Sequence, residues 1–211
     1  MRPGITTVLF DWDGTLCDSG AAVMRAFEKS LAEFGVHFTR AQYNAVYTPA
    51  WRVMYQAFGL PQTHWPQAEE RWTFHFQGEQ PQLLPGAAEV VETLRQAGLQ
   101  LGIVTGANRD RLAAELSRLG LDGSFASIVC HEDVVHTKPH PEGIDNSLAR
   151  LRSDPRNCCF VGDAPDDIRM GQSAGVLTVA VRSDYVDAAR LEECGADHLL
   201  QAIAELPMII A

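Results

Sequence analysis

Short apolar runs rich in β-branched residues recur along the chain, and segments with helical periodicity separate most of them. We predict strands over Thr6–Phe10, Leu101–Thr105, Ser127–Cys130, Cys158–Gly162 and Leu177–Val181, with a weaker strand at His198–Leu199. We predict helices over Ala87–Ala97, Arg109–Leu119, Glu142–Leu151, Asp167–Ala174 and Asp187–Cys194. Apolar strands that alternate with helices indicate an α/β protein whose parallel sheet is covered on both faces. Ligands of such sheets bind at the carboxyl ends of the strands.

The long stretch between the first and second strands has a different pattern. It holds no convincing strand, and helical patterns cover Ala21–Phe34 and Ala50–Phe58. Twelve of the chain's 17 aromatic residues lie between Phe27 and Phe76, which indicates a separate small core. We therefore predict a helical cap domain over residues 16–83, inserted into an α/β core formed by residues 1–15 and 84–211.

Composition narrows the class of protein. The chain has 211 residues, 46% of them hydrophobic, and a formal net charge of −10, which argues against non-specific nucleic-acid binding. No apolar run approaches membrane-spanning length, and the apolar stretch that ends at Phe10 is too short for a signal peptide. Five cysteines without a CxxC spacing indicate a reduced, cytoplasmic protein. Nothing in the sequence separates a monomer from a homodimer.

Two carboxylates follow the first predicted strand at positions i and i+2. Asp11 and Asp13 can point into one site while Trp12 turns away. Such a pair can hold a hard cation such as magnesium. One carboxylate can also attack phosphorus while the other handles the proton of the leaving group. Taken alone, an Asp-rich turn at Gly14 would be the favoured interpretation of the same residues.

A hydroxyl, a glycine and a helix start follow the second predicted strand. Thr105 supplies the hydroxyl, Gly106 a backbone N–H, and Asn108 a plausible helix N-cap. Together these groups offer a place for a phosphoryl group at a helix N-terminus. The alternative interpretation is an ordinary strand end followed by a capped helix.

Two later segments add a cation and two carboxylates. Lys138 lies in a loop with two prolines, and a lysine there can pair with a carboxylate and with phosphate oxygens. Asp163 follows the strand that ends at Gly162, and Asp167 lies in the first turn of the next helix. Asp163 is a candidate ligand of a cation. Asp167 is a candidate to support the cation or its bound waters. Each signal is modest alone, but all four motifs fall where a parallel sheet would gather them into one cleft.

The set of motifs resembles the haloacid dehalogenase superfamily, and specifically its phosphoglycolate phosphatase-like branch with a helical cap. The residues that carry the resemblance are Asp11-Trp12-Asp13-Gly14-Thr15-Leu16, Asp18-Ser19, Thr105-Gly106, Lys138-Pro139 and Gly162-Asp163 through Ala174-Gly175. The resemblance implies a Rossmann-like, doubly wound core. It also implies a phosphatase that acts on a small phosphorylated metabolite.

The resemblance assigns a role to each motif. Asp11 is expected to attack phosphorus, and Asp13 to act first as general acid and then as general base. Mg²⁺ is the expected cofactor, held by Asp11, by the backbone carbonyl of Asp13 and by Asp163, with Asp167 supporting the site.

The phosphoryl group and its charge are assigned to other residues. Thr105 and the Gly106 N–H are expected to hold the phosphoryl group, with Asn108 beside them. Lys138 is expected to neutralise the charge that Asp11 and the phosphate share.

Two departures bear on the choice among relatives. Asp13 disfavours carbon–halogen hydrolysis, because dehalogenases of the superfamily lack an acid at that position. Sugar phosphomutases of this branch carry a cap histidine where this chain has Val23, which weakens the phosphomutase alternative. A catalytically silent regulatory or scaffold protein is a third alternative, and the intact set of catalytic residues argues against it.

The sequence of the cap does not show which leaving group the substrate carries. Arg52 is our candidate among the cap residues for contact with the substrate. His131, His136 and His140 are closely spaced, but they fit no tetrahedral zinc pattern, and we interpret them as surface or structural residues.

Overall fold

A six-stranded parallel sheet forms the centre of the protein. The computed structural model describes residues 4–48 and 50–210, so the ends of the predicted core segments at residues 1–3 and 211 lie outside the described residues. The sheet has the order β5-β4-β1-β6-β7-β8, and all its strand pairs are parallel. The strands are β1 (Thr7–Phe10), β4 (Gln100–Val104), β5 (Ser127–Val129), β6 (Cys158–Gly162), β7 (Leu177–Val181) and β8 (His198–Leu200).

The central strand β1 is apolar because both of its faces are covered. Every residue of β1 is buried, and β1 pairs with β4 on one side and β6 on the other. Phe10 aligns with Ile103 and Val161, so the three strands end at nearly the same level. This register places the residues that follow β1, β4 and β6 at one edge of the sheet.

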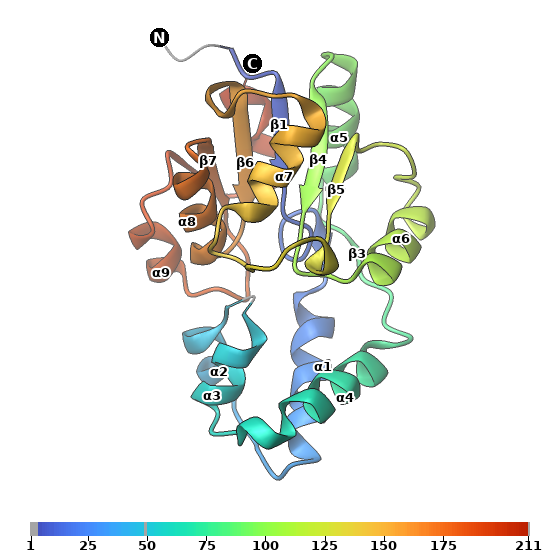
Figure 1. The fold of residues 1–211 in the computed structure, drawn as a ribbon, viewed down its shortest axis with the longest axis vertical. Helices are drawn as coiled ribbons and strands as arrows, with labels where there is room; N and C mark the ends of the chain where they lie inside the picture. The colour runs from blue at the N-terminus through green and yellow to red at the C-terminus, as the bar shows by residue number, and fades with distance from the viewer. Residues whose placement is uncertain (1–3, 49, 211) are drawn as a thin grey trace.

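Helices cover both faces of the sheet. The helices of the core are α5 (Ala87–Gln96), α6 (Arg109–Arg118), α7 (Glu142–Leu151), α8 (Pro165–Ala174), α9 (Ala188–Glu193) and α10 (Pro207–Ile210). Side chains of α5 and α6 join one apolar cluster, whereas side chains of α7 and α8 join the cluster on the opposite face. Figure 1 shows α7 and α8 in front of the strands and α5 behind them.

This architecture confirms the predicted α/β class with a doubly wound parallel sheet. All six predicted strands are present within about one residue of their predicted ends, and the five predicted core helices are present within two. Among the described residues, no helix combines the length and the apolar character that a membrane crossing requires.

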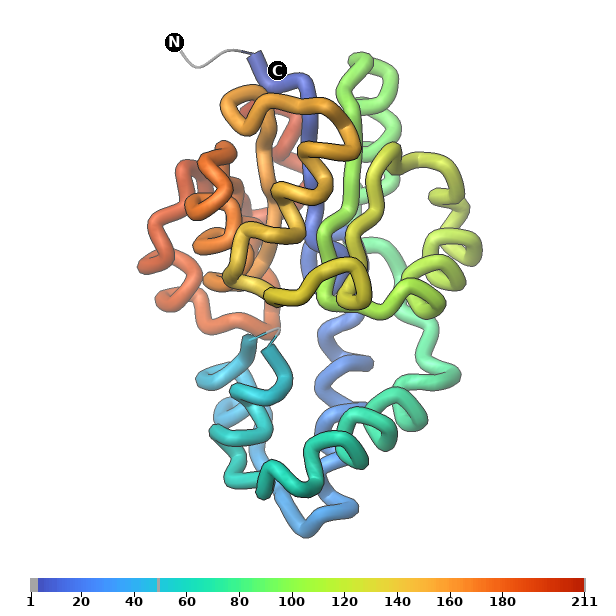
Figure 2. The backbone as a smooth tube through the Cα atoms, in the orientation of Figure 1, coloured from blue at the N-terminus to red at the C-terminus, as the bar shows by residue number. Residues whose placement is uncertain are grey.

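Four helices form a separate body at the carboxyl end of the sheet (Figures 1 and 2). They are α1 (Gly20–Ala32), α2 (Arg40–Val46), α3 (Trp51–Ala57) and α4 (Trp65–Phe76). They share an apolar cluster built largely from aromatic rings, in which Phe27 stacks on Tyr55 with ring centroids 5.4 Å apart. α1 and α3 match the predicted helical patterns, whereas the sequence pattern did not reveal α2 and α4.

The expectation that residues 16–83 hold no strand is wrong at its two ends. β2 (Cys17–Asp18) and β3 (Gln82–Leu83) form a short antiparallel ribbon where the chain enters and leaves the four helices. Two residues per strand give no period-2 pattern, so the sequence could not reveal them. We refer to α1–α4 as the cap and to the sheet with its covering helices as the core; the exact boundaries of the two domains stay a prediction.

Candidate active site

Three strands of the sheet each deliver one polar residue to the same edge. Asp11 follows β1, Thr105 follows β4 and Asp163 follows β6. Because aligned parallel strands end together, residues more than 150 positions apart in sequence become neighbours. Lys138 joins them from the loop before α7.

Lys138 connects two buried carboxylates. Its Nζ donates to Asp11 Oδ1 at 2.5 Å and lies 2.7 Å from Asp167 Oδ1. The three side chains are almost fully buried, with exposed fractions of 7%, 6% and 0%. Burial alone would lower the pKa of Lys138, but the charges of Asp11 and Asp167 outweigh it and raise that pKa. The ammonium is therefore charged and fixed in position.

The carboxylates of Asp11, Asp163 and Asp167 form a buried acidic cluster. One oxygen of each lies within 4.8 Å of the others. Burial raises the pKa of Asp11 to about 7, although Lys138 opposes the shift. Burial and the charges of Asp167 and Asp11 also raise the pKa of Asp163 well above its ordinary value. Three buried carboxylates with one ammonium leave excess negative charge, and clustered carboxylate oxygens suit a hard divalent cation.

Two glycines permit this close packing of carboxylates. Gly14 has a φ of +78°, and a Cβ there would lie 2.2 Å from Asp163 Oδ2. A Cβ on Gly162 would lie 2.4 Å from the Cβ of Asp167. Any side chain at either position would displace a member of the acidic cluster, so both glycines are required by space.

Asp13 has partners that the sequence analysis did not identify. Its Oδ1 accepts a 2.5 Å hydrogen bond from the Ser19 hydroxyl and also contacts Arg111 Nη2. Its Oδ2 accepts from Arg111 Nη1 at 3.1 Å. The planar guanidinium of Arg111 thus holds the Asp13 carboxylate with two parallel hydrogen bonds.

Arg111 and Glu115 stand at i and i+4 on α6, and neither was selected from the sequence. The structure buries them: their side chains are 12% and 8% exposed, and Arg111 Nε donates to Glu115 Oε1 at 2.9 Å. The indole of Trp12 donates to Glu115 Oε2 at 2.6 Å. The only signal in the sequence was a charged pair on the helix that follows Thr105-Gly106, and that signal alone does not distinguish a site from a solvated face.

The residues assigned to the phosphoryl group lie beside Asp11 but differ in their surroundings. Thr105 is 5% exposed, and its Oγ1 accepts a 3.1 Å hydrogen bond from Ala107 N. Thr105 and Gly106 line a cavity together with Asp11 and Lys138. Asn108 uses its side-chain oxygen to cap α6, where it accepts from Arg111 N at 3.0 Å. This capping bond uses the side-chain oxygen, so the amide Nδ2 is the group that Asn108 can offer to a phosphoryl oxygen.

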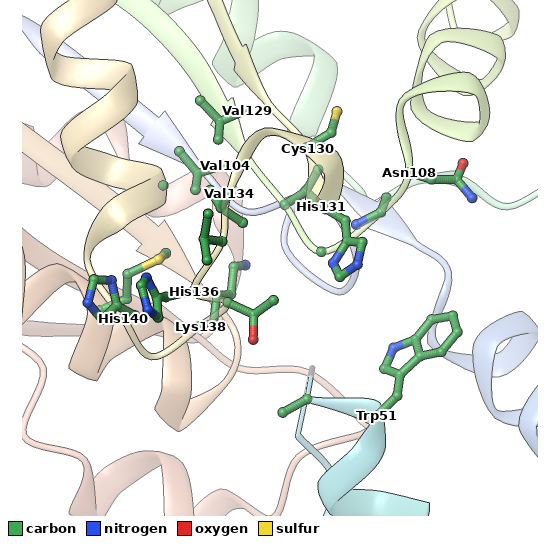
Figure 3. Close-up of a pocket in the computed structure, with 18 of the residues that line it drawn as sticks. Trp51, Val104, Asn108, Val129, Cys130, His131, Val134, His136, Lys138 and His140 are labelled. Carbon is green, nitrogen blue, oxygen red and sulfur yellow. The ribbon is translucent and has the colours of Figure 1, made fainter. Parts of the chain in front are cut away.

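A cavity of about 570 Å³ lies between the core and the cap. Figure 3 shows Trp51 of α3 on the cap side and Lys138 with His131 and His136 on the core side. Arg52 also lines this cavity, but its side chain is 73% exposed and its Nε lies 3.6 Å from Glu69 Oε1.

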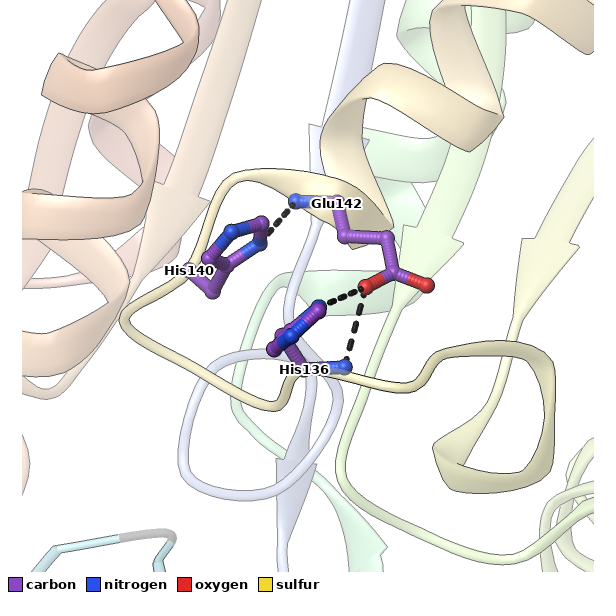
Figure 4. Close-up of side chains that lie close together, drawn as sticks. All are labelled: His136, His140 and Glu142. Atoms are coloured by element: carbon purple, nitrogen blue, oxygen red, sulfur yellow. Dashed lines mark hydrogen bonds and ion pairs between the residues drawn. The ribbon is translucent and has the colours of Figure 1, made fainter.

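Two histidines and Glu142 gather at the rim of the cavity (Figure 4). Glu142 accepts hydrogen bonds from the backbone N–H groups of Val135 and His136 at 2.8 and 2.9 Å, and His136 Nδ1 lies 2.9 Å from its Oε2. These bonds lower the pKa of Glu142 to about 2. His140 Nδ1 accepts from Glu142 N at 3.2 Å. The bonds support our structural interpretation of these histidines, because together they fix the loop that carries Lys138.

Comparison with known proteins identifies relatives of this chain. Residues 8–181 match the family model described as haloacid dehalogenase-like hydrolase. A pyrophosphatase PpaX from Bacillus pumilus is 31% identical, over 98% of this chain and 96% of that protein. A phosphoglycolate phosphatase from Agrobacterium fabrum is 29% identical, over 90% of this chain and 86% of that protein.

The fold is shared with solved structures as well. The crystal structure of a predicted phosphoglycolate phosphatase from Haemophilus somnus superposes with a TM-score of 0.87 at 19% identity, over the whole of both chains. This match concerns the fold, whereas the family model and the curated relatives concern the class of enzyme. Together they confirm the resemblance stated from the motifs: this chain belongs to the haloacid dehalogenase-like hydrolases and is an enzyme of their phosphatase group.

Proposed function

We propose that this protein is a magnesium-dependent phosphatase that hydrolyses a small phosphate monoester through a phosphorylated Asp11. One observation carries the proposal: the Asp11 carboxylate, 2.5 Å from Lys138 Nζ, is buried in an acidic cluster beside the Thr105-Gly106 segment. The relatives named pyrophosphatase and phosphoglycolate phosphatase are consistent with a small phosphorylated substrate.

In the proposed reaction Asp11 acts as the nucleophile. Lys138 holds one of its oxygens, so the carboxylate has a defined orientation. In the first step Asp11 forms a bond to phosphorus while the bond from phosphorus to the leaving oxygen breaks. Asp13 gives its proton to that leaving oxygen.

Hydrolysis of the phosphorylated Asp11 completes the cycle. Asp13, now a carboxylate, takes a proton from water as the water oxygen bonds to phosphorus. The bond between phosphorus and Asp11 breaks, so inorganic phosphate leaves and Asp11 is restored. Thr105 and the Gly106 N–H are positioned to hold the phosphoryl oxygens during both steps, and Lys138 offsets their negative charge.

The acidic cluster fits a divalent cation. Asp11 and Asp163 would bind it with the backbone carbonyl of Asp13, while Asp167 holds Lys138 and accepts from Ala164 N at 3.1 Å. When bound, Mg²⁺ supplies positive charge that neutralises the phosphate. The raised pKa of Asp11, caused mainly by burial, supports this assignment, because a cation would favour its charged form.

The phosphatase is favoured over the phosphomutase by one residue of the cap. Val23 lines the cavity that contains Asp11 and Asp13, and it carries no group that can transfer a proton. A mutase must also retain a phosphorylated intermediate for return to the sugar, for which this apolar side chain offers no help.

The decisive experiment replaces the nucleophile. We expect Asp11→Asn to abolish Mg²⁺-dependent hydrolysis of p-nitrophenyl phosphate while the protein stays folded by circular dichroism. Asp122→Asn, an exposed carboxylate on the core, is the matched control and should keep wild-type turnover. Mass spectrometry of acid-quenched wild-type enzyme should find the added phosphate on the peptide that contains Asp11. Undiminished turnover by Asp11→Asn would exclude the mechanism.

A further inference from the structure

Arg111 occupies a site between the core and the cap that the proposed reaction does not use. Its two Nη atoms hold both oxygens of Asp13, and its Nε donates to Glu115. All three nitrogens of the guanidinium are therefore engaged by carboxylates. The Arg111 side chain is 12% exposed, so water competes little for these hydrogen bonds.

The position of this guanidinium is fixed from three sides. Glu115 is itself held by the indole of Trp12 at 2.6 Å, which anchors the Nε edge of Arg111 to the core. From the cap, the ring of Phe76 lies 4.3 Å from the guanidinium carbon and that of Trp72 lies 6.0 Å away. Cations over aromatic faces are attracted to them, and more strongly where water is excluded. The Nη atoms contact Asp13, and Arg111 lines the cavity that also contains Asp11 and Asp13.

The ion pair conflicts with the task of Asp13. Arg111 holds both oxygens of Asp13, so the Asp13 side chain is kept from turning toward the leaving oxygen. Both Asp13 oxygens are committed, since Oδ1 also accepts from Ser19. Leaving a buried guanidinium without its partner is strongly unfavourable. The pair therefore breaks readily only if another anion takes the place of Asp13.

Other cationic side chains around the cavity are poorly placed to bind an anion on the leaving group. Lys138 is held by Asp11 and Asp167, on the side of the nucleophile. Arg52 is 73% exposed and lies near Glu69. Among the described residues that line the cavity, Arg111 is the arginine adjacent to the proton donor, and so adjacent to the leaving group.

We propose that Arg111 selects substrates whose leaving group carries its own negative charge, and that this charge exchanges with Asp13 on the Nη edge. The exchange releases the Asp13 side chain, which can then turn toward the leaving oxygen when such a substrate is bound. A neutral leaving group cannot replace Asp13, so Asp13 stays bound to Arg111. Arg111 is thus a specificity-determining residue, and this inference rests on the proposed phosphatase function.

Two substrates that differ in one charge test the exchange. Phosphoglycolate has a carboxylate on its leaving group, whereas 2-hydroxyethyl phosphate has a neutral hydroxymethyl group of similar size. We expect wild-type kcat/KM to favour phosphoglycolate by about 100-fold or more, because a buried cation discriminates strongly against an analogue that leaves it unpaired. Arg111→Gln should bring this ratio close to one, and Arg111→Lys should give an intermediate ratio.

Arg109→Gln is the matched control on the same helix. Arg109 is 51% exposed and pairs with Asp133 at 2.5 Å, away from the cavity, so its loss should leave the ratio unchanged. Equal losses for both substrates in Arg111→Gln would show that Arg111 only supports Asp13, and they would overturn the inference. A wild-type enzyme without preference for the charged substrate would overturn it too.

A binding measurement separates this inference from the proposed function. Asp11→Asn enzyme should bind phosphoglycolate more tightly than 2-hydroxyethyl phosphate by calorimetry, and adding Arg111→Gln should remove the difference. If Asp11→Asn kept its turnover, the proposed mechanism would fail whatever the role of Arg111. If Asp11→Asn is inactive but the binding difference survives Arg111→Gln, only the inference about Arg111 fails.

Discussion

The core and the cap present opposite kinds of surface to the cavity that they share. The core contributes charged groups that are almost fully buried and paired, such as Lys138 between Asp11 and Asp167. The cap contributes the rings of Trp51 and Trp72, and its charged pair at the cavity, Arg52 and Glu69, is 73% and 39% exposed. Fixed charges suit phosphoryl transfer, which depends mainly on positioning and charge stabilisation. An apolar cap suits the exclusion of water from that chemistry.

The largest expected effect comes from breaking the charge balance of the core. Lys138→Met leaves Asp11 and Asp167 buried without their cation. Removing one partner of a buried ion pair costs about 3–5 kcal/mol of folding stability. Loss of a preorganised charge at the reacting group lowers kcat by about 10²–10³-fold. Urea unfolding of metal-free protein and steady-state kinetics with Mg²⁺ measure the two effects.

The chain provides its own control for that experiment. Lys29 is the other of its two lysines, and it is exposed on α1 of the cap. Lys29→Met should change neither stability nor kcat appreciably. A Lys138→Met enzyme with wild-type kcat would remove the distinction drawn between the charged core and the apolar cap.

The next effect concerns the aromatic cluster of the cap. Phe27 contacts the rings of Phe38, Tyr43, Tyr55 and Phe58. Phe27→Ala should destabilise the cap by about 3–5 kcal/mol, because it leaves a cavity among rigid rings. Hydrogen exchange should accelerate in α1–α4 while β1, β4 and β6 stay protected.

An exposed phenylalanine of the same cap serves as the comparison. The side chain of Phe74 is 54% exposed, so Phe74→Ala should change stability by about 0.5 kcal/mol or less. Uniform acceleration of exchange across sheet and cap in Phe27→Ala would mean that the two regions unfold as one unit.

A smaller effect is expected from pH. Burial raises the folded-state pKa of Asp11 to about 7 from 3.8, so metal-free folded protein binds a proton that the unfolded chain releases. Stability therefore falls as pH rises through this window and levels off above pH 7. Between pH 5.5 and 8 the loss is about 2 kcal/mol for this one group. That loss lowers Tm by about 4–8 °C.

The Asp11→Asn variant isolates this contribution. It should show a flatter dependence of Tm on pH, measured with EDTA, and added Mg²⁺ should stabilise wild-type protein more at pH 8 than at pH 5.5. Identical slopes for wild type and Asp11→Asn would contradict the assignment of the raised pKa to Asp11.

The smallest expected effect is that of Arg52. Its exposed pair with Glu69 contributes about 0–1 kcal/mol, so Arg52→Gln should leave Tm unchanged. We expect KM for a phosphate monoester to rise by less than about fivefold, since exposed charges interact weakly in water. A much larger rise in KM would mean that Arg52 turns inward when substrate binds, and that the cap also contributes a charge to substrate binding.

The parts of the fold that depend on local pattern could be predicted from the sequence. β6 and β7 have the predicted bounds because continuous apolar runs bounded by glycine or charge leave little choice. The helix α2 was missed because Tyr43 is its only buried residue, which gives no apolar stripe. Its one local signal was the capping box of Thr39 and Gln42.

The residues of the site also divide into those that the local sequence pattern predicts and those that it does not. Asp11 and Asp163 could be placed together because each follows a predicted strand and parallel strands end at one edge of the sheet, and Lys138 was assigned to the same edge from its loop. The partnership of Arg111 with Asp13 could not be predicted, because it depends on the cap rings that cover α6. Burial created by a distant segment leaves no trace in the local sequence.

The ribbon of β2 and β3 joins the cap directly to the loop that carries Asp13. Leu84 N donates to Leu16 O, and Gly14 N donates to Cys17 O at 2.8 Å, one residue after Asp13. The two segments that connect the cap to the core are therefore hydrogen-bonded to each other. A movement of the cap would thus be transmitted through this ribbon to the segment that carries Asp13, the proposed general acid.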